Sequence, residues 1–231
     1  MRVMVLDVET VMKKSVLPYD IGYKIIDTRT KETLCSKSLA IWDIFKNKNL
    51  LNSAYYAEKI PHYYEELKLK IRRLVSFVTA KHEIYTDLEL YHVKRVFAYN
   101  ANFDINALNT ANHEIAGNPE SFFPKNIEIG CIWHCACQVL LNSRYIKFCI
   151  ENKYFSNKGT IRTGAEYVYR FITKNVNFEE IHMGLQDVQI ETEILYAVYR
   201  QKKKMDISPY TGCYRIVQEK YLKYIERKTI N

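Results

Sequence analysis

The sequence predicts one α/β domain with a mixed sheet and a basic helical extension. Segments with strand character are concentrated in the first 131 residues, and helical patterns dominate the rest. A length of 231 residues suits one large domain or one domain with an appendage. Of the net charge of +8, residues 200–231 carry +6, from nine Lys/Arg and three Asp/Glu. We therefore divide the chain into a domain over residues 1–205 and an extension over 206–231, whose charge favours a polyanionic partner.

Composition excludes several other classes of protein. Gly (7) and Pro (5) are too scarce for collagen or low-complexity disorder. No apolar run approaches the roughly 18 residues of a transmembrane helix, and the acid at Asp7 comes too early for a signal peptide. We expect no membrane partner and a cytoplasmic location, in a host cytoplasm if a phage encodes the chain. Six cysteines without an export signal are expected to be reduced.

Five segments have the pattern of strands. The apolar run 2–8 predicts a buried central strand. Further strands are expected over 16–28, 31–40, 95–99 and 127–131, with a turn at 27–30 between the second and third. The sheet is therefore predicted to have five strands.

Helical spacing of apolar residues predicts the remaining elements. After Pro61, one long helix is expected over 63–82, with Leu67, Ile71, Leu74 and Val78 as its apolar stripe. The other helices are expected over 103–115, 132–141, 164–174, 185–204 and 214–228. Helices are predicted to flank the sheet.

The first predicted strand ends in Asp7-Val8-Glu9-Thr10. Side chains alternate along a strand, so Asp7 and Glu9 point the same way, about 6.6–7 Å apart. Two carboxylates at the end of a buried strand raise each other's pKa unless a divalent cation neutralises them. The spacing alone is weak, because Asp87-Leu88-Glu89 repeats it in this chain.

Two further acids follow at places where ligand sites form. Asn100-Ala101-Asn102-Phe103-Asp104 joins a predicted strand to a helix, and open α/β sheets bind ligands at the carboxyl ends of strands. His182 precedes Asp187 by five residues at the start of a later helix. Each motif is weak alone.

Together and in this order, the three motifs resemble those of the DEDDh (DnaQ-like) 3′→5′ exonucleases of the ribonuclease H-like superfamily. That family carries Asp-x-Glu-Thr, Asn-x-x-Phe-Asp and His-x4-Asp, here Asp7–Thr10, Asn100–Asp104 and His182–Asp187. The likeness spans roughly residues 1–200. Met183 stands where the sister class has Tyr, so His182 selects the His subclass.

The resemblance implies a ribonuclease H-like fold and a two-metal mechanism with Mg²⁺ or Mn²⁺. It implies that Asp7 bridges both ions, that Glu9 and Asp187 complete one site and that Asp104 serves the other. His182 is implied to be the general base, and its usual pKa of about 6.5 suits that role. The implied substrate-binding residues are Thr10, Asn100 and Phe103, although Phe103 is expected to pack in the core rather than contact bases.

The departures from the family pattern concern the nucleotide pocket more than the metal centre. Val11 stands where Gly is frequent, and Gly130-Cys131 stands where Asp-Thr is frequent. Glu191 shares a helix face with Asp187 and is expected at the surface. The cluster Cys131, His134, Cys135 and Cys137 lacks a matching second pair of zinc ligands, and packing is the favoured interpretation.

These observations predict a metal-dependent 3′→5′ exonuclease on single-stranded DNA or RNA ends, with DNA favoured. The alternative is a catalytically silent module of the same fold that binds nucleic acid or a replication or repair protein. The filled motif positions favour the enzyme. A second copy of the chain stays open as a partner. The basic helix over 214–228 either follows a nucleic-acid strand with its Tyr, Lys and Arg residues or docks through its Tyr/Ile face.

Overall fold

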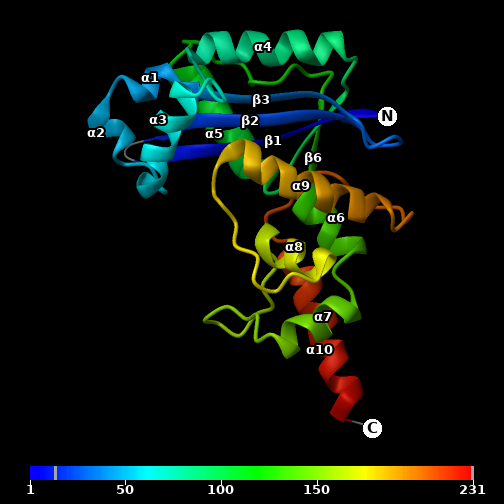
Figure 1. Cartoon of the computed structure of the whole chain (residues 1–231). Coiled ribbons are helices and arrows are strands. Elements are labelled where there is room, and N and C mark those ends of the chain that lie inside the picture. Colours follow the sequence, from blue (N-terminus) through cyan, green and yellow to red (C-terminus); the bar gives the residue numbers. More distant parts are fainter. Residues whose placement is uncertain (13–14, 230–231) are drawn as a thin grey trace.

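The computed structural model describes residues 1–12 and 15–229, which form a mixed sheet flanked by helices (Figure 1). The sheet has six strands in the order β4-β3-β2-β1-β5-β6. Strand β2 is antiparallel to β1 and β3, and every other neighbouring pair is parallel. The strands are β1 (Arg2–Met12), β2 (Val16–Asp27), β3 (Thr33–Ile41), β4 (Arg73–Val75), β5 (Arg95–Ala98) and β6 (Glu128–Cys131).

The alternation of side chains along β1 divides the core into two clusters, one on each face of the sheet. Met4 and Leu6 pack with residues of α4 (Phe77–Leu90) and α5 (Ala101–Glu114). Val3 and Val5 pack on the other face with α6 (Ile132–Val139) and α9 (Gly184–Tyr199). Figure 1 shows α4 above the strands and α9 beneath them. The central strand is therefore apolar on both faces, as strands covered on two sides must be.

Among the described residues, β4 is the strand that the sequence did not predict. Residues 63–82 were expected to form one helix, and this expectation is wrong: α3 (Ile60–Lys68) and α4 are separated by a loop and by β4, which pairs with β3. Lys70 adopts φ 59°, which ends the helical path, and the Ser76 side chain caps α4 by accepting from the Thr79 amide. Of the predicted apolar stripe, Leu67 packs against the core, whereas Ile71, Leu74 and Val78 are exposed at 62%, 39% and 56%.

Helix α9 lies unusually close to β2 at one point. A Cβ on Gly22 would lie 2.2 Å from the Leu185 amide nitrogen, so only glycine fits there. Gly22 pairs with Asp7 in the sheet. This close approach brings the first turn of α9 directly over the acidic end of β1.

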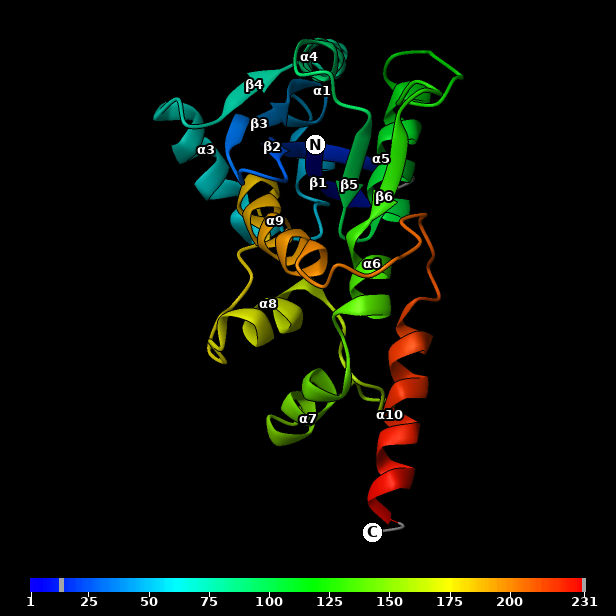
Figure 2. The ribbon, with the colours of Figure 1, turned by 90° about the vertical axis from the view of Figure 1, so that its right-hand side faces the viewer.

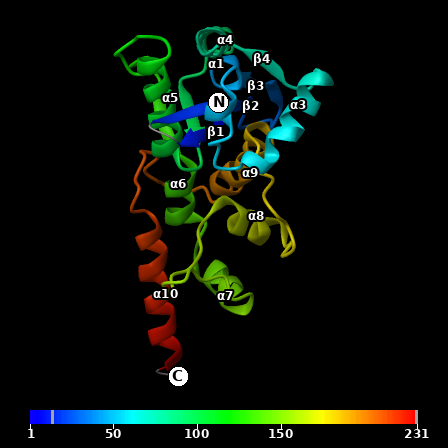
Figure 3. The same ribbon diagram turned by 90° about the vertical axis from the view of Figure 1, so that its left-hand side faces the viewer.

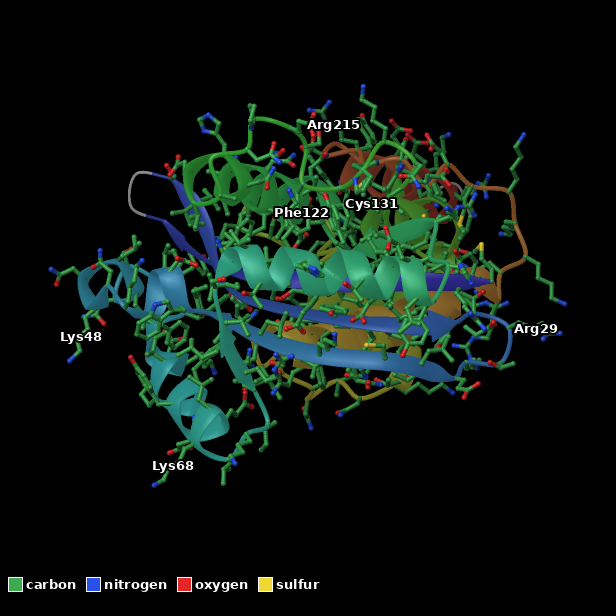
Figure 4. All side chains as sticks on the ribbon, turned by 90° about the horizontal axis from the view of Figure 1, so that it is seen from above. Arg29, Lys48, Lys68, Phe122, Cys131 and Arg215 are labelled. Atoms are coloured by element: carbon green, nitrogen blue, oxygen red, sulfur yellow. The ribbon has the colours of Figure 1, made fainter. Side chains whose placement is uncertain are left out.

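Between β3 and α3, the chain forms three short elements that the sequence left unassigned: α1 (Trp42–Phe45), α2 (Lys48–Leu51) and the 3₁₀ turn η1 (Ala57–Lys59). They carry Tyr55 and Tyr56 to the end of β1, where Val11 and Ala54 form a bridge. From above, α4 runs along the strands with Phe122 beside it (Figure 4). The rings of Phe77 and Phe122 lie 5.7 Å apart.

The second half of the chain extends the domain away from the sheet (Figures 1 and 2). Helices α7 (Ser143–Glu151) and α8 (Ala165–Thr173) lie below α9, and α10 (Tyr214–Thr229) ends at the far tip (Figure 3). Helix α9 ends at Tyr199, five residues before the predicted end, and α7 was not predicted. Within residues 1–12 and 15–229, none of the helices has the length and apolarity needed to cross a membrane.

Candidate active site

Asp7 and Glu9 lie on the face of β1 that α9 covers. They continue the alternation of Val3 and Val5, and they pair with Gly22 and Asp20 of β2. The register between β1 and β2 shifts directly after Glu9. Glu9 is only 7% exposed and Asp7 is half-buried with its Oδ2 atom covered, so uncompensated charge on either acid is costly.

Asp104 reaches the same place from α5. Strand β5 runs parallel to β1, and α5 begins three residues after β5 ends, so its first turn lies at the carboxyl edge of the sheet. The Val8 amide donates a hydrogen bond of 3.2 Å to Asp104 Oδ1. This bond ties the α5 carboxylate to the backbone between Asp7 and Glu9.

The start of α9 supplies the third group of residues. Asp187 lies in the first turn of α9, and His182 lies two residues before the helix with φ 58°, in the left-handed region. Ligand atoms of Glu9, His182 and Asp187 all lie within 4.8 Å of one another. Three motifs that are far apart in the sequence therefore meet at one point.

These residues line a cleft of about 360 Å³. Asp7, Glu9, Asp104, His182 and Asp187 all contribute to its wall, and so do two acids that the sequence analysis did not place there, Glu180 and Glu191.

The surface position expected for Glu191 is wrong, because its side chain is only 3% exposed. Helix α9 is covered by the sheet on one side and by α6 and α8 on the other, so few of its residues reach solvent. Glu191 follows Asp187 by four residues, and residues at this spacing are neighbours on one face of a helix. This spacing was the sequence signal that Glu191 lies beside Asp187. Glu180 has no such signal, since it precedes the helix.

Burial raises the pKa of every acid in the cleft. Desolvation, with repulsion from Asp187 and Asp20, raises the pKa of Glu9 to about 9. Desolvation and repulsion from Glu180 raise the pKa of Asp187 to about 8. Desolvation raises the pKa of Asp104 to about 7, although the hydrogen bond from the Val8 amide lowers it in part. Asp7 is desolvated and faces Glu191, so its pKa lies well above the usual range. A divalent cation would remove both penalties.

The donor set fits hard divalent cations. Asp7 Oδ2, Asp187 Oδ1 and Glu191 Oε2 are buried oxygens without a hydrogen-bond partner among the described residues. Neither lysine nor arginine is among the described residues that line the cleft. Carboxylate oxygens are the ligands that Mg²⁺ and Mn²⁺ prefer, so the residues present suit these ions.

A second hollow of about 420 Å³ adjoins the acidic cleft. Thr10, Asn100 and Phe103 line it, together with Tyr55 and Tyr56. The core packing expected for Phe103 is wrong, since the residue is 39% exposed. Exposed aromatic faces beside a polar wall suit a planar heterocycle.

The cysteine cluster lies outside this site. Cys131, Cys135 and Cys137 are buried free thiols, and His134 Nδ1 lies 2.8 Å from the Ser208 carbonyl. These side chains pack between α6 and the segment before α10, as the favoured interpretation expects.

Comparison with known proteins supports the architecture. No family model matches the chain, and no curated protein matches its sequence. Among solved structures, the nuclease domain of 3′hExo, a DEDDh family member bound to rAMP, superposes with a TM-score of 0.58 at 9% identity, covering 90% of this chain and 96% of that one. A 3′-exonuclease solved for 3′-end specific recognition of histone mRNA stem-loop gives a TM-score of 0.59 at 9% identity, covering 89% and 84%.

E. coli exonuclease I, in complex with a dA16 oligonucleotide, gives a TM-score of 0.54 at 10% identity over 94% of this chain and 42% of that longer one. These three structures share the fold of this chain over 89–94% of its length. The predicted fold is therefore confirmed in all but the number of strands: the protein has the ribonuclease H-like fold of the DEDDh 3′ exonucleases.

Proposed function

We propose that the protein is a metal-dependent 3′→5′ exonuclease that hydrolyses single-stranded nucleic acid, DNA in preference to RNA, to nucleoside 5′-monophosphates. The observation that carries this proposal is the convergence of Asp7, Glu9, Asp104 and Asp187 with His182 at one end of the sheet. Their order along the chain matches that of the DEDDh motifs, and the fold agrees with it.

The four acids divide the work of holding two divalent cations. Asp7, whose charge interacts with those of Glu9, Asp104 and Asp187, would hold both ions. Glu9 and Asp187 would complete one site with their adjacent oxygens, and Asp104 would serve the second. Two such ions, when bound, activate water and stabilise the leaving oxygen of a phosphodiester. Glu9, Asp104 and Asp187 are buried, and the lower dielectric around buried groups strengthens the interaction between carboxylates and cations.

His182 takes the proton from the attacking water. Desolvation, together with the nearby Lys59, lowers its pKa, so the ring is neutral and able to accept a proton at physiological pH. Its nitrogen lies within 4.8 Å of carboxylate oxygens of Glu9 and Asp187, beside the site where the water would be held.

The aromatic hollow receives the terminal nucleotide. Tyr55 is 68% exposed and Phe103 39%, so both offer ring faces on which a base can stack. Alanine substitution of such platforms costs about 1–3 kcal/mol per base. Thr10 and Asn100 supply polar contacts beside them. The solved neighbours carry rAMP and a dA16 oligonucleotide, which supports a nucleotide as the ligand of this hollow.

The test is digestion of 5′-labelled single-stranded DNA and RNA of equal sequence with Mg²⁺, Mn²⁺ or EDTA. Wild type is compared with Glu9→Gln and with Glu89→Gln, which alters the second Asp-x-Glu of the chain at an exposed position. We expect a ladder that shortens from the 3′ end, DNA faster than RNA, lost in E9Q and in EDTA but retained in E89Q.

Intact strands under every metal condition would overturn the proposal. If binding persisted in that case, the protein would be a silent module of this fold. If E9Q were as active as wild type, the acidic cleft would not be the site of the nuclease activity.

A further inference from the structure

Arg72 is a buried cation outside the proposed catalytic groups. It lies in the loop between α3 and β4, and its side chain has no solvent exposure. The guanidinium stacks on the Tyr63 ring with its carbon 4.2 Å from the ring centroid. A fully buried arginine is costly unless its donors are paired, and both pairs that it forms lead toward α9.

The first connection runs through Asp20. Arg72 Nη1 donates to Asp20 Oδ1. Asp20 Oδ2 accepts from the Tyr63 hydroxyl at 2.9 Å and from the Gly184 amide at 3.0 Å. Gly184 is the first residue of α9, so the arginine holds the carboxylate that caps this helix.

The second connection runs through Glu66. Arg72 Nε donates to Glu66 Oε2 at 2.8 Å, and the other oxygen of that carboxylate, Oε1, accepts from Gln186 Nε2 at 3.1 Å. Gln186 lies in the first turn of α9, directly before Asp187. The two connections thus bind α9 at positions 184 and 186, between His182 and Asp187.

We infer that Arg72, Asp20 and Glu66 form a clamp that positions the first turn of α9, and with it His182 and Asp187, over Glu9. The role of the two positioned residues rests on the proposed function; the clamp itself rests on the contacts above. The clamp contacts α9 at the Gly184 amide and the Gln186 side chain, and its three side chains are not among the described residues that line the acidic cleft. Arg72, Asp20 and Glu66 are therefore positioning residues.

The position of the clamp explains why charge is used here. Asp20 lies opposite Glu9 in the sheet and would add a further negative charge to an already acidic cleft. Arg72 neutralises Asp20 while leaving its oxygens able to accept from Gly184. An apolar pair could fill the space equally well, but it could not hold an amide and a glutamine at once.

The test breaks the second connection, in which the Glu66 side chain is half-buried. Glu66→Ala removes the carboxylate, and Gln186→Leu removes its α9 partner. The matched controls are Glu65→Ala, the exposed neighbour on α3, and Gln189→Leu, which sits on α9 and loses a hydrogen bond to Lys24. Hydrogen exchange of the amides in 182–188 is measured on the full chain, with kcat and KM on labelled DNA beside it.

We expect amide exchange in 182–188 to accelerate at least about 10-fold in E66A and Q186L and not in E65A or Q189L. A misplacement of about 1 Å can cost roughly 100-fold in rate, so we expect kcat to fall about 10-fold with KM unchanged. The double variant should be no worse than either single one, because both break the same connection.

Exchange and kcat that match those of the two controls would overturn the clamp. A uniform rise in exchange across the chain would also overturn it, since that result means general destabilisation. The exchange measurement needs no nuclease activity. A wild-type chain that does not cleave, but in which E66A loosens 182–188, would therefore contradict the proposed function and leave the clamp intact.

Discussion

The imidazole ring of His182 stacks face to face on the phenol ring of Tyr56, with ring centroids 4.0 Å apart and planes at 7°. His182 has φ 58°, a strained conformation for a residue with a side chain, and the stack is the contact that orients its ring. Stacking covers one ring face and leaves the edge nitrogens free to point at Glu9 and Asp187.

The stack predicts that Tyr56 supports catalysis through its ring. Tyr56→Phe should retain kcat, whereas Tyr56→Leu should lower it about 10-fold, because a general base out of position loses much of the 10²–10⁴-fold that acid–base catalysis supplies. Steady-state kinetics on labelled DNA measure both values. The neighbouring Tyr55→Leu, in the aromatic hollow, should raise KM and leave kcat nearly unchanged; a fall in kcat for Y55L equal to that for Y56L would contradict this division.

The charges beside His182 predict that substitutions at two neighbouring residues shift the pH dependence of kcat in opposite directions. Desolvation and Lys59 lower the pKa of His182, whereas Glu58 raises it. A lowered pKa moves the acid limb of the rate profile below the usual value of about 6.5. Lys59→Gln should move that limb upward and Glu58→Gln should move it downward, as measured by kcat between pH 5 and 9. Shifts in the same direction for both variants would exclude His182 as the titrating base.

The raised acid pKa values predict that the metal-free protein becomes less stable as pH rises. Glu9 has a pKa of about 9 in the folded chain against 4.5 when unfolded. The folded state therefore holds more protons than the unfolded state across this window, and its stability falls from about pH 4.5 toward pH 9.

Mg²⁺ or Mn²⁺ should reverse this loss. At about 100 times the dissociation constant, binding adds about 2.7 kcal/mol, or several degrees in Tm. Thermal unfolding with metal and with EDTA at pH 5, 7 and 8.5 measures the difference, which should grow with pH and shrink in Glu9→Gln. A difference independent of pH would contradict the assignment of the ions to the buried acids.

The groove between α7 and α10 predicts the path of a longer nucleic-acid strand over the protein surface. It has a volume of about 540 Å³, its described lining contains no acid, and its walls are Asn142, Ser143, Ile146, Lys220, Lys223, Tyr224, Arg227 and Lys228. Lys220 is engaged by the carbonyls of Cys137, Gln138 and Leu141 at 2.7, 3.0 and 3.3 Å. Lys223 and Lys228 are exposed and offer charge to phosphates.

Substituting side chains tests this better than deleting residues 206–231, because Cys213 and Val217 are buried in the core. Replacing both Lys223 and Lys228 with Gln should weaken binding of a 30-nucleotide strand and reduce its salt slope by about 1.4, at about 0.7 per phosphate contact. A 6-nucleotide strand should bind as before. Fluorescence anisotropy in EDTA measures this, with Lys68→Gln at the end of α3 and Lys70→Gln in the loop that follows as the control pair. An unchanged slope would remove α10 from the binding surface.

Local sequence patterns were sufficient to predict several helices and strands of this chain. The apolar runs of β1, β2 and β5 and the spacing of α5 and α9 predicted these elements to within a few residues, except at the end of α9. They failed over 63–82, where helical spacing was real but Arg72 turns inward. The guanidinium pairs with Asp20 and Glu66 from the loop after α3, and no pattern within the segment reveals the partner on β2.

The sequence by itself determined the chemistry of the site. Three motifs in order named Asp7, Glu9, Asp104, His182 and Asp187, and strand alternation placed the first two on one face. Only the tertiary structure decided what surrounds them: Glu191 buried in the cleft, Tyr56 stacked on His182, and Arg72 linked to α9. Burial and stacking depend on which elements cover a residue, and those elements lie far away in the chain. The motifs name the groups of the proposed site, whereas packing sets their pKa values and orientation.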